Sequence, residues 1–413
     1  MKVRLDELIQ AIAVALDTVE AKLLGASFNH GKRIAVLCSL MSRELGLDIE
    51  EIKAITTSAL FHDNALTEYI LSEQETGEIQ EFNMKRHCVF GQRNINALPF
   101  GSSAKDLILY HHEQADGNGP FGKKADEIPV GAQLIAIADM VDVTYHLNRV
   151  SSADLEAIRS EVASQSGKIY TKTATDAMLT VLDKSTLDLL SDRNIEETAA
   201  ILIPPWEVKL TDNTLIRLAK LAARIIDYAS AFTRRHSVEI ADKIWHMGNY
   251  YGFNSTKRTK AYLAAALHDL GKLATPTEIL EKPGKLTDSE FGIIKAHAHV
   301  TYDLLSGITG FEEICDWASN HHEKLDGSGY AFGKKADELD FVSRLIACAD
   351  IYQAVSEARP YHQARSHDET IEILFDMVDK GQVDREIVND FNIVFGDHAR
   401  IDALPLREKL LVS

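Results

Sequence analysis

Residues 321–340 read HHEKLDGSGYAFGKKADELD, and residues 111–129 read HHEQADGNGPFGKKADEIP. The two stretches share the twin histidines, the glycines of a short turn and the run FGKKADE. Similarity repeated at a separation of about 210 residues indicates that a whole domain is duplicated. In a chain of 413 residues the repeat predicts two domains of roughly 200 residues, and each is large enough to bury its own core.

Residues of metal-ligand type extend this repeat on either side of the twin histidines. A single histidine is more often a hydrogen-bonded core residue than a ligand, but one order of seven residues kept in both halves indicates a metal site. Imidazole and carboxylate ligands without thiolate suit Fe, Mn, Zn, Co or Ni, and coordination positions left open for water are typical of catalytic centres. The two series are His30, His62, Asp63, His87, His111, His112 and Asp139, and His236, His268, Asp269, His297, His321, His322 and Asp350.

Apolar residues recur at three- and four-residue intervals through most of the chain, so we expect an all-α fold. Pro204-Pro205 should end a helix, which places the domain boundary between residues 1–203 and 204–413. Thr287 and Glu290 predict a capping box that starts the helix carrying His297. Helices are expected at 5–24, 32–45, 49–62, 103–113 and 129–147, and at 212–230, 233–251, 256–271, 287–306, 311–322, 340–356, 367–379 and 385–395.

The formal charge of -18 argues against a nucleic-acid polymer as partner, because binding a phosphate backbone requires clustered Lys and Arg. A small anionic substrate stays compatible, since divalent cations attract phosphate locally. The four cysteines form no CxxC pair, which favours a reducing compartment. No apolar run approaches the roughly 20 residues that span a bilayer. We therefore expect a cytoplasmic protein without a membrane partner.

The C-terminal half resembles the HD-GYP subfamily of HD-domain phosphohydrolases. Besides His236 and His297, the resemblance is carried by HDLGK (268–272), ILEKPGKLT (279–287), HHEKLDGSGY (321–330), ACADIYQA (347–354) and ARPYHQA (358–364). The N-terminal half is similar to a second, diverged copy. The resemblance implies two tandem HD-domain helical bundles, two divalent transition-metal ions such as Fe or Mn in the catalytic domain, and hydrolysis of cyclic di-GMP or 3′,3′-cyclic GMP-AMP.

The resemblance also assigns roles by position. Asp269 would bridge the two ions and act in catalysis, with a hydroxide held between the ions as the nucleophile. Lys272 would neutralise a phosphate oxygen and so serve both catalysis and substrate binding. Tyr330 would contact the phosphate or base, and Arg359 would clamp the second phosphate. The implied metal ligands are His236, His268, Asp269, His297, His321, His322 and Asp350.

The C-terminal half departs from the family pattern at a few positions. Ala331 replaces the Pro of the GYP signature, while Gln353 and His362 stand where the family usually has an acid and a base, which leaves substrate preference open. Family members with a third metal share an acid at the place that Phe232 occupies here, so we expect two metals.

The N-terminal half keeps the ligand set and loses the groups expected to hold substrate. Leu66 stands at the position of Lys272, Pro120 at that of Tyr330, and no RPY follows Asp139. Residues 1–203 are therefore interpreted first as a metal-binding regulatory domain. A second catalyst of unknown substrate and a purely structural domain stay open.

For the whole chain the leading prediction is a cyclic-dinucleotide phosphodiesterase. The alternative is a non-hydrolysing receptor that binds the dinucleotide and signals to a partner protein, and the intact Lys272, Tyr330 and Arg359 favour the enzyme. A phosphomonoesterase or nucleotidase is disfavoured by the GYP-type loop. The sequence leaves open the preferred dinucleotide, linear or fully cleaved product, the native metal, and whether the chain forms a homodimer.

Overall fold

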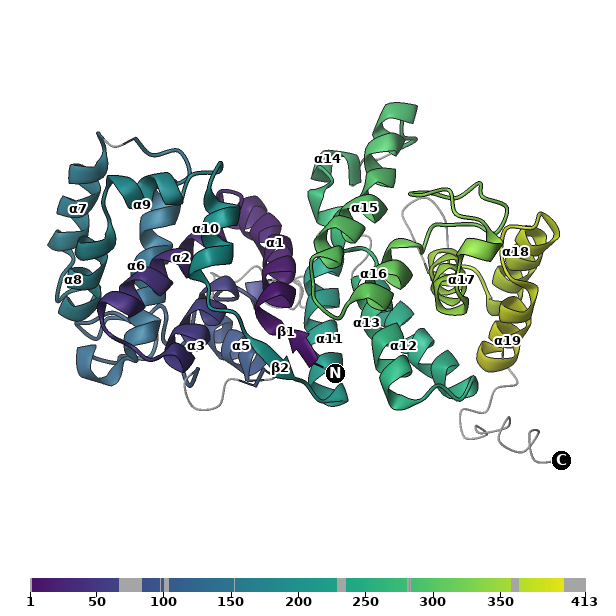
Figure 1. Ribbon diagram of the computed structural model, residues 1–413, viewed down its shortest axis with the longest axis horizontal. Helices are drawn as coiled ribbons and strands as arrows, with labels where there is room; N and C mark the ends of the chain where they lie inside the picture. Colours follow the sequence, from purple (N-terminus) through teal and green to yellow (C-terminus); the bar gives the residue numbers. More distant parts are fainter. Residues whose placement is uncertain are drawn as a thin grey trace. The chain divides into compact units, whose positions relative to one another are not determined.

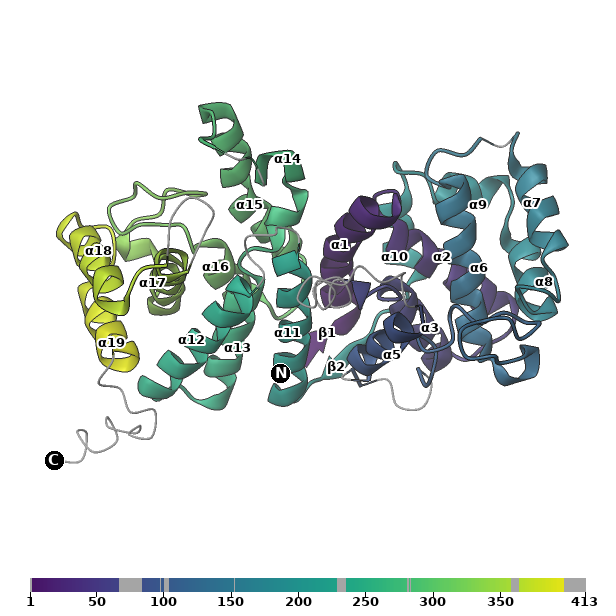
Figure 2. The ribbon, with the colours of Figure 1, turned by 180° about the vertical axis from the view of Figure 1, so that it is seen from behind.

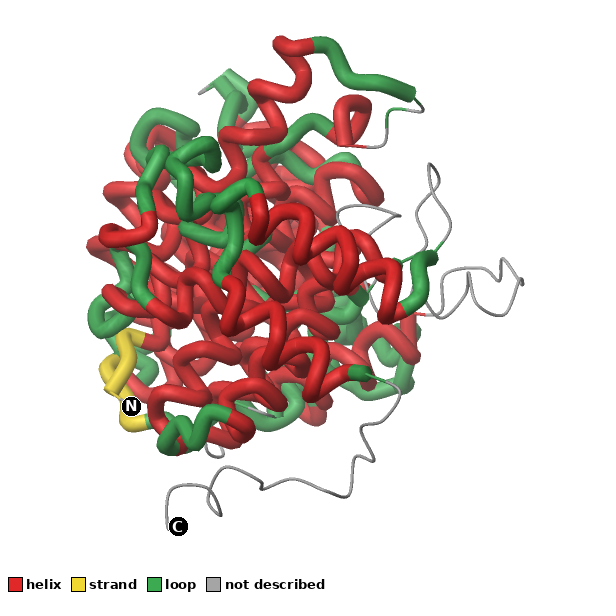
Figure 3. Tube along the Cα trace, turned by 90° about the vertical axis from the view of Figure 1, so that its right-hand side faces the viewer, coloured by secondary structure: helices red, strands yellow, loops and turns green. Residues whose placement is uncertain are grey.

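The computed structural model describes residues 2–66, 84–96, 98–99, 104–151, 153–228, 235–280, 282, 284–357 and 364–396. Helices dominate these residues, and β1 (Lys2–Arg4) and β2 (Glu207–Lys209) are the only strands among them (Figures 1 and 3). The predicted all-α fold is confirmed. The two strands pair, and the Leu5 amide donates to the Trp206 carbonyl (2.9 Å). These bonds tie the start of the first helix to the end of the first half of the chain.

The chain divides into two compact units, which we call the N-terminal and C-terminal units. The N-terminal unit is Arg4–Val208, and the C-terminal unit runs from Lys209 onward and includes the first three residues. The division lies a few residues beyond the boundary expected at 203/204. Helix α10 ends at Leu202, before Pro204-Pro205, and β2 then carries the chain out of the unit.

Helix α2 is the centre of the N-terminal unit. It packs against α1, α3, α6, α8 and α10 (Figures 1 and 2). Residues 34–39 are buried around its whole circumference. A helix enclosed on all sides needs no polar face over that stretch. The helices are α1 Leu5–Leu24, α2 His30–Glu44, α3 Ile49–Leu60, α5 Met84–Ile95, α6 Val130–Tyr145, α7 Leu155–Ser164, α8 Lys172–Val181, α9 Lys184–Leu189 and α10 Ile195–Leu202, with the 3₁₀ helix η1 Ala125–Glu127.

Helix α13 has the corresponding central place in the C-terminal unit. It packs against α11, α12 and α16 (Figures 1 and 2). Residues 261–267 are all buried. The elements are α11 Asp212–Tyr228, α12 His236–Tyr250, α13 Ser255–Leu267, η2 Leu270–Ala274, α14 Thr277–Leu280, α15 Asp288–Ser306, α16 Glu312–Ser319, η3 Ala336–Glu338, α17 Phe341–Ser356, α18 His367–Asp379 and α19 Arg385–Phe395.

Most expected helices are present, with ends shifted by a few residues. The helix expected at 103–113 is wrong, because the described residues 104–112 form consecutive turns. Asp106 has φ +62°, a left-handed conformation that an α-helix cannot include. The capping box is confirmed, since Glu290 accepts from the Thr287 amide (2.7 Å) and Thr287 accepts from the Glu290 amide (3.3 Å). None of the helices in the described ranges is long and apolar enough to cross a membrane.

The loop after the twin histidines has one scaffold in both units. Glu323 accepts from the amides of Phe332 (2.6 Å) and Gly333 (3.0 Å), and Glu113 accepts from the Lys123 amide (2.6 Å). Gly329 lies so close to this carboxylate residue that a Cβ would be 2.6 Å from the Glu323 Cα. The shared glutamate and glycine therefore fold each loop back over its own twin histidines.

Candidate metal centres

The His-Asp pair of the C-terminal unit lies where α13 ends and η2 begins. The Thr301 hydroxyl of α15 donates to the His268 carbonyl (3.0 Å) and accepts from the Gly271 amide (2.9 Å). A Cβ at Gly271 would collide with the His297 carbonyl oxygen, so glycine is needed there for the close approach of the two segments. The pair is thereby fixed against α15, the helix that carries His297.

Backbone carbonyls set the orientation of three histidine rings in this unit. The Nδ1 atoms of His268, His297 and His321 lie 2.7, 2.6 and 2.6 Å from carbonyl oxygens three residues earlier. A carbonyl only accepts, so each Nδ1 must carry the proton and donate it. Each Nε2 is then an unprotonated lone pair that points into the site, which is the form that binds a metal ion.

Asp269 separates these lone pairs into two groups. Its Oδ2 lies 3.1 Å from His268 Nε2 and 3.9 Å from His236 Nε2, while its Oδ1 lies 3.4 Å from His297 Nε2 and 3.7 Å from His321 Nε2. The residue is buried. One carboxylate oxygen therefore faces each group, which is the geometry expected of a ligand that bridges two ions.

Asp350 joins the remaining histidines. Its Oδ1 lies 3.1 Å from His236 Nε2 and its Oδ2 lies 3.4 Å from His322 Nδ1. Glu357 reaches the other side of the His236 ring, 3.4 Å from Nδ1. Burial would lower the pKa of His236, but the neighbouring Asp350 and Glu357 raise it to about 9. All seven predicted ligands of the C-terminal unit thus converge on one buried point.

The electrostatics of the site favour cations. Burial lowers the pKa of His297 to about 4 and that of His322 to about 3, so both imidazoles are neutral at pH 7. Burial would raise the pKa of Asp269, but His268 and Lys272 hold it well below its usual range. Neutral imidazole and ionised carboxylate are the states in which these side chains bind metal.

The contacts test whether metal ions fit. The Nε2 atoms of His297 and His321 lie 3.0 Å apart, although both rings already donate through Nδ1, so two lone pairs face each other. Oδ1 of Asp269 is buried without a hydrogen-bond partner. Acceptors facing acceptors in a buried site are unfavourable unless a cation lies between them. The residues therefore fit a centre of divalent ions.

Two of the three residues expected to bind substrate lie beside the centre, and the third lies outside the described residues. The Lys272 ammonium lies 2.5 Å from Asp269 Oδ2, so it contacts the carboxylate that is predicted to bridge the ions. The Tyr330 ring lies 4.7 Å from the His322 ring and borders the centre. Arg359, like Phe232 and His362, lies outside the described residues.

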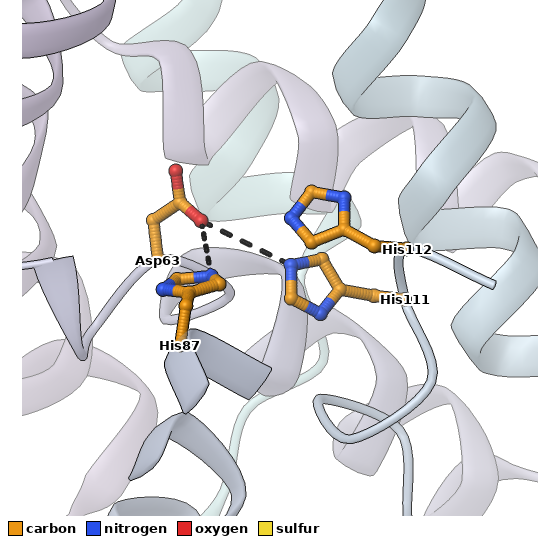
Figure 4. Close-up of side chains that lie close together, drawn as sticks. All are labelled: Asp63, His87, His111 and His112. Atoms are coloured by element: carbon orange, nitrogen blue, oxygen red, sulfur yellow. Dashed lines mark ion pairs between the residues drawn. The ribbon is translucent and has the colours of Figure 1, made fainter. Parts of the chain in front are cut away.

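The N-terminal unit has a closely similar centre. In Figure 4, Asp63, His87, His111 and His112 point toward one another, with Asp63 Oδ1 lying 3.0 Å from His87 Nε2 and 3.9 Å from His111 Nε2. The other oxygen of Asp63 lies 3.7 Å from His62 Nε2. Asp63 therefore lies between two groups of histidines, as Asp269 does in the C-terminal unit.

The remaining N-terminal ligands complete the second position. Asp139 Oδ1 lies 3.2 Å from His30 Nε2 and 3.7 Å from His62 Nε2. These three side chains form one potential metal-binding group, and the four side chains of Figure 4 form another. All seven N-terminal residues singled out from the sequence are thus brought together, and the lone pairs of His62 and His111 are buried without hydrogen-bond partners.

Sequence reasoning missed the residues that support the ligands. In the N-terminal unit, Asp142 Oδ2 lies 2.6 Å from His30 Nδ1, and Arg33 donates to both oxygens of Asp142 (2.7 and 2.9 Å). Asp17 and Asp227 accept from the amides of Gly31 (2.8 Å) and Ser237 (2.9 Å), which begin α2 and α12. The sequence offered one signal for these residues, namely acids inside an apolar helical pattern. The same pattern is also expected of an amphipathic helix whose acids face solvent, so it did not identify them.

The HD-domain family profile matches residues 19–160 and 218–387. The chain therefore belongs to the HD-domain family and carries the domain twice. The HD-GYP resemblance is confirmed, since "3'3'-cGAMP-specific phosphodiesterase 1" of Vibrio cholerae is 31% identical over 93% of this chain and 90% of its own length. "Cyclic di-GMP phosphodiesterase response regulator RpfG" of Xanthomonas campestris is 35% identical over 39% of this chain and 42% of its own.

A solved structure shows the same fold. The crystal structure of a cyclic GMP-AMP specific phosphodiesterase of V. cholerae (V-cGAP3) superposes with a TM-score of 0.67 at 22% identity. The match covers 97% of this chain and 99% of that one. The tandem arrangement of two helical units is therefore shared along the whole length of that protein.

Proposed function

We propose that the C-terminal unit, from about residue 204 onward, is a metal-dependent phosphodiesterase that hydrolyses a cyclic dinucleotide. The observation that carries the proposal is Asp269, whose two oxygens face separate histidine groups while Lys272 reaches the same carboxylate. This arrangement provides two adjacent cation positions and one ammonium at a single buried point. A phosphodiester gains negative charge as it is attacked, so it is the substrate class that such a centre stabilises.

The chain's residues supply binding, orientation and charge. Two divalent ions of the Fe or Mn type would activate water and polarise the phosphodiester when bound. His268, His297 and His321 hold their lone pairs inward because their Nδ1 protons are committed to the backbone. Lys272 would turn from Asp269 to a phosphate oxygen. Water adds across one P–O bond, so its oxygen goes to phosphorus and its proton goes to the departing ribose oxygen.

Substrate recognition would fall to residues at the border of the centre. The Tyr330 ring beside His322 offers a face on which a base or ribose can pack, and Lys295 adds a positive charge 5.6 Å from the ring centre. Arg359 is proposed to bind the second phosphate. Among the relatives described above, the one that aligns along the whole chain is named for 3′3′-cGAMP, so this dinucleotide stands first and cyclic di-GMP second.

The N-terminal unit, residues 1–203 with the strand that follows, is proposed as a metal-binding regulatory domain. Leu66 is buried where the C-terminal unit has Lys272, so no ammonium reaches the Asp63 carboxylate from that position. We also propose a cytoplasmic location, supported by four buried free cysteines, and no nucleic-acid polymer partner, supported by the charge of -18. A homodimer is the oligomeric state to test first.

The decisive experiment is a substrate panel on the full chain. Mn- and Fe-loaded protein is incubated with 3′3′-cGAMP, cyclic di-GMP and cyclic di-AMP, and linear and mononucleotide products are separated by chromatography. We expect turnover of at least one dinucleotide that is lost on chelation. Tight binding of a dinucleotide without turnover in the presence of either metal would overturn the phosphodiesterase proposal and favour a non-hydrolysing receptor.

A further inference from the structure

Glu20 is a buried acid beside the N-terminal metal centre that the seven-residue ligand series does not include. It lies on α1, its side chain is 1% exposed, and its Oε2 is 3.9 Å from His30 Nε2. This oxygen is buried without a hydrogen-bond partner. A buried carboxylate oxygen without a hydrogen-bond donor is unfavourable, so a cation beside this oxygen would stabilise it.

A hydrogen bond between α1 and α2 fixes the position of the Glu20 carboxylate. Asp17, one turn earlier on the same face of α1, accepts from the Gly31 amide (2.8 Å) and so fixes α1 against the start of α2. His30 is the first residue of α2. The bond from Asp17 therefore sets the register that brings Glu20 to the His30 ring, on the side where Asp139 lies 3.2 Å from the same nitrogen.

The sequence that joins Asp227 to His236 holds no counterpart of Glu20. Asp227 makes the same contact to the start of α12 that Asp17 makes to α2, but the chain from 228 to 235 reads YASAFTRR and holds no carboxylate. Asp17 precedes His30 by 13 residues, whereas Asp227 precedes His236 by 9. The N-terminal unit therefore has a longer connection and an additional acid at one edge of its centre.

We propose that Glu20 is an additional metal ligand that closes the N-terminal centre. At metal–ligand distances of about 2.1 Å, neighbouring and opposite donors of an octahedral ion lie about 3.0 and 4.2 Å apart. The 3.2 Å from Asp139 to His30 and the 3.9 Å from Glu20 to His30 fall within that range. Glu20 would fill the coordination position that a catalytic centre leaves for water or substrate.

The additional carboxylate also changes the character of the centre. Asp63, Asp139 and Glu20 would give the N-terminal centre three carboxylates, against Asp269 and Asp350 in the C-terminal unit. Oxygen-rich sites favour harder ions such as Mn²⁺. The N-terminal unit would therefore hold its ions without offering them to a phosphodiester.

The test compares Glu20→Gln with the parent chain, both full length, with and without Mn²⁺. Glutamine keeps the volume of the side chain and removes its charge. Without metal we expect the variant to be as stable as the parent or more stable, because Oε2 of Glu20 has no hydrogen-bond partner to lose. With Mn²⁺ we expect the order to reverse, with an affinity loss of at least about tenfold at the N-terminal centre only. Chelator titration followed by metal analysis, and melting temperatures, give the two readouts.

Two further variants make the result decisive. Glu7→Gln removes an acid from the same helix far from the centre and should change neither metal content nor the effect of Mn²⁺ on melting. Glu20→Asp keeps the charge on a shorter side chain and should recover part of the affinity. A Glu20→Gln variant that is equally destabilised with and without metal, or that binds Mn²⁺ like the parent, would overturn the proposal. Neither readout depends on hydrolysis, so failure here is distinct from failure of the phosphodiesterase proposal.

Discussion

The two metal centres of this chain share one ligand set and differ in what surrounds it. In the C-terminal unit, Lys272 and Tyr330 border the centre, and each provides chemistry that a phosphodiester can use. In the N-terminal unit, buried Leu66 takes the place of the lysine and Glu20 brings a further acid. If both sets bind metal as proposed, the comparison teaches that the same ligands serve both centres and that the residues around them set apart the centre proposed to hydrolyse a substrate.

The support behind the first histidine also differs. His30 contacts Asp142, which Arg33 pairs with, and both members of this pair are fully buried. At the corresponding place in the C-terminal unit, Gln353 donates to Glu239 (2.7 Å) and accepts from Lys243 (2.6 Å). The N-terminal histidine is thus held by a buried ion pair. In the C-terminal unit Nδ1 of His236 faces Glu357 (3.4 Å), and the residues at the places of Asp142 and Arg33 form a partly buried network of their own.

The largest difference between the centres should appear on removing the bridging acids. Asp269→Ala should abolish dinucleotide hydrolysis and lose C-terminal metal, because one carboxylate faces both histidine groups. Asp63→Ala should lose N-terminal metal and keep measurable turnover. Metal analysis and product formation on the full chain check both. Retention of all ions by Asp269→Ala would contradict the bridging role, and equal loss of turnover in the two variants would contradict the division of labour.

The lysine should separate catalysis from metal binding. Lys272→Leu installs the residue that the N-terminal unit carries, and we expect kcat to fall by about 10²–10³ through loss of an ammonium near the developing phosphoryl charge. Metal content should stay at the parent level, because the ligands are untouched. The matched control is Lys334→Leu in the adjacent loop. A rate within twofold of the parent would show that Lys272 has no part in the reaction.

The buried pair behind His30 should matter for stability in one unit only. Arg33→Met leaves the buried Asp142 without its partner, which costs about 3–5 kcal/mol for a buried ion pair. Glu239→Gln at the corresponding C-terminal place should cost under about 1 kcal/mol, because that network is partly exposed. Amide hydrogen exchange, resolved along the chain, measures the local stability of each unit separately. Equal protection of α2 in the two variants would refute the comparison.

The ligand series could be predicted because it rests on residue identity and order alone. His236, Asp269 and Asp350 are separated by whole helices, yet the repeat of the same order in the first half removes most of the ambiguity. The helices carrying them follow from apolar periodicity and from a capping box whose two residues lie three apart. The described turns at 104–112 were missed because Asp106 adopts a left-handed conformation that periodicity does not reveal.

The supporting residues could not be predicted because they act across packing interfaces. Glu20 and Asp142 lie in apolar stretches, where an acid is normally assigned to the solvent-exposed face of a helix. Only the packing of α1 and α6 on α2 shows that both side chains point inward. The same holds for Thr301, which fixes the turn after His268 from another helix. Such partners have no fixed spacing from the ligands, so a single sequence does not indicate them.

The smallest expected effect is on the pH dependence of stability, which tests whether the site histidine His297 is buried in its neutral form. Burial lowers the pKa of His297 to about 4, against 6.5 for an ordinary histidine. Between these two pH values the imidazole is protonated in the unfolded chain and neutral in the folded protein. The stabilising contribution of neutral His297 in metal-free protein is therefore fully present above pH 6.5 and is lost as the pH falls toward 4, by on the order of 3 kcal/mol. His297→Gln should flatten this dependence in the C-terminal unit, whereas His246→Gln, at an exposed position of α12, should not. Burial also lowers the pKa of His112 well below its usual range, so this residue should contribute in the same direction in the N-terminal unit. Chemical unfolding between pH 7 and 4 measures the slopes, and a His297→Gln variant whose stability falls as steeply as that of the parent chain would contradict the burial of a neutral His297.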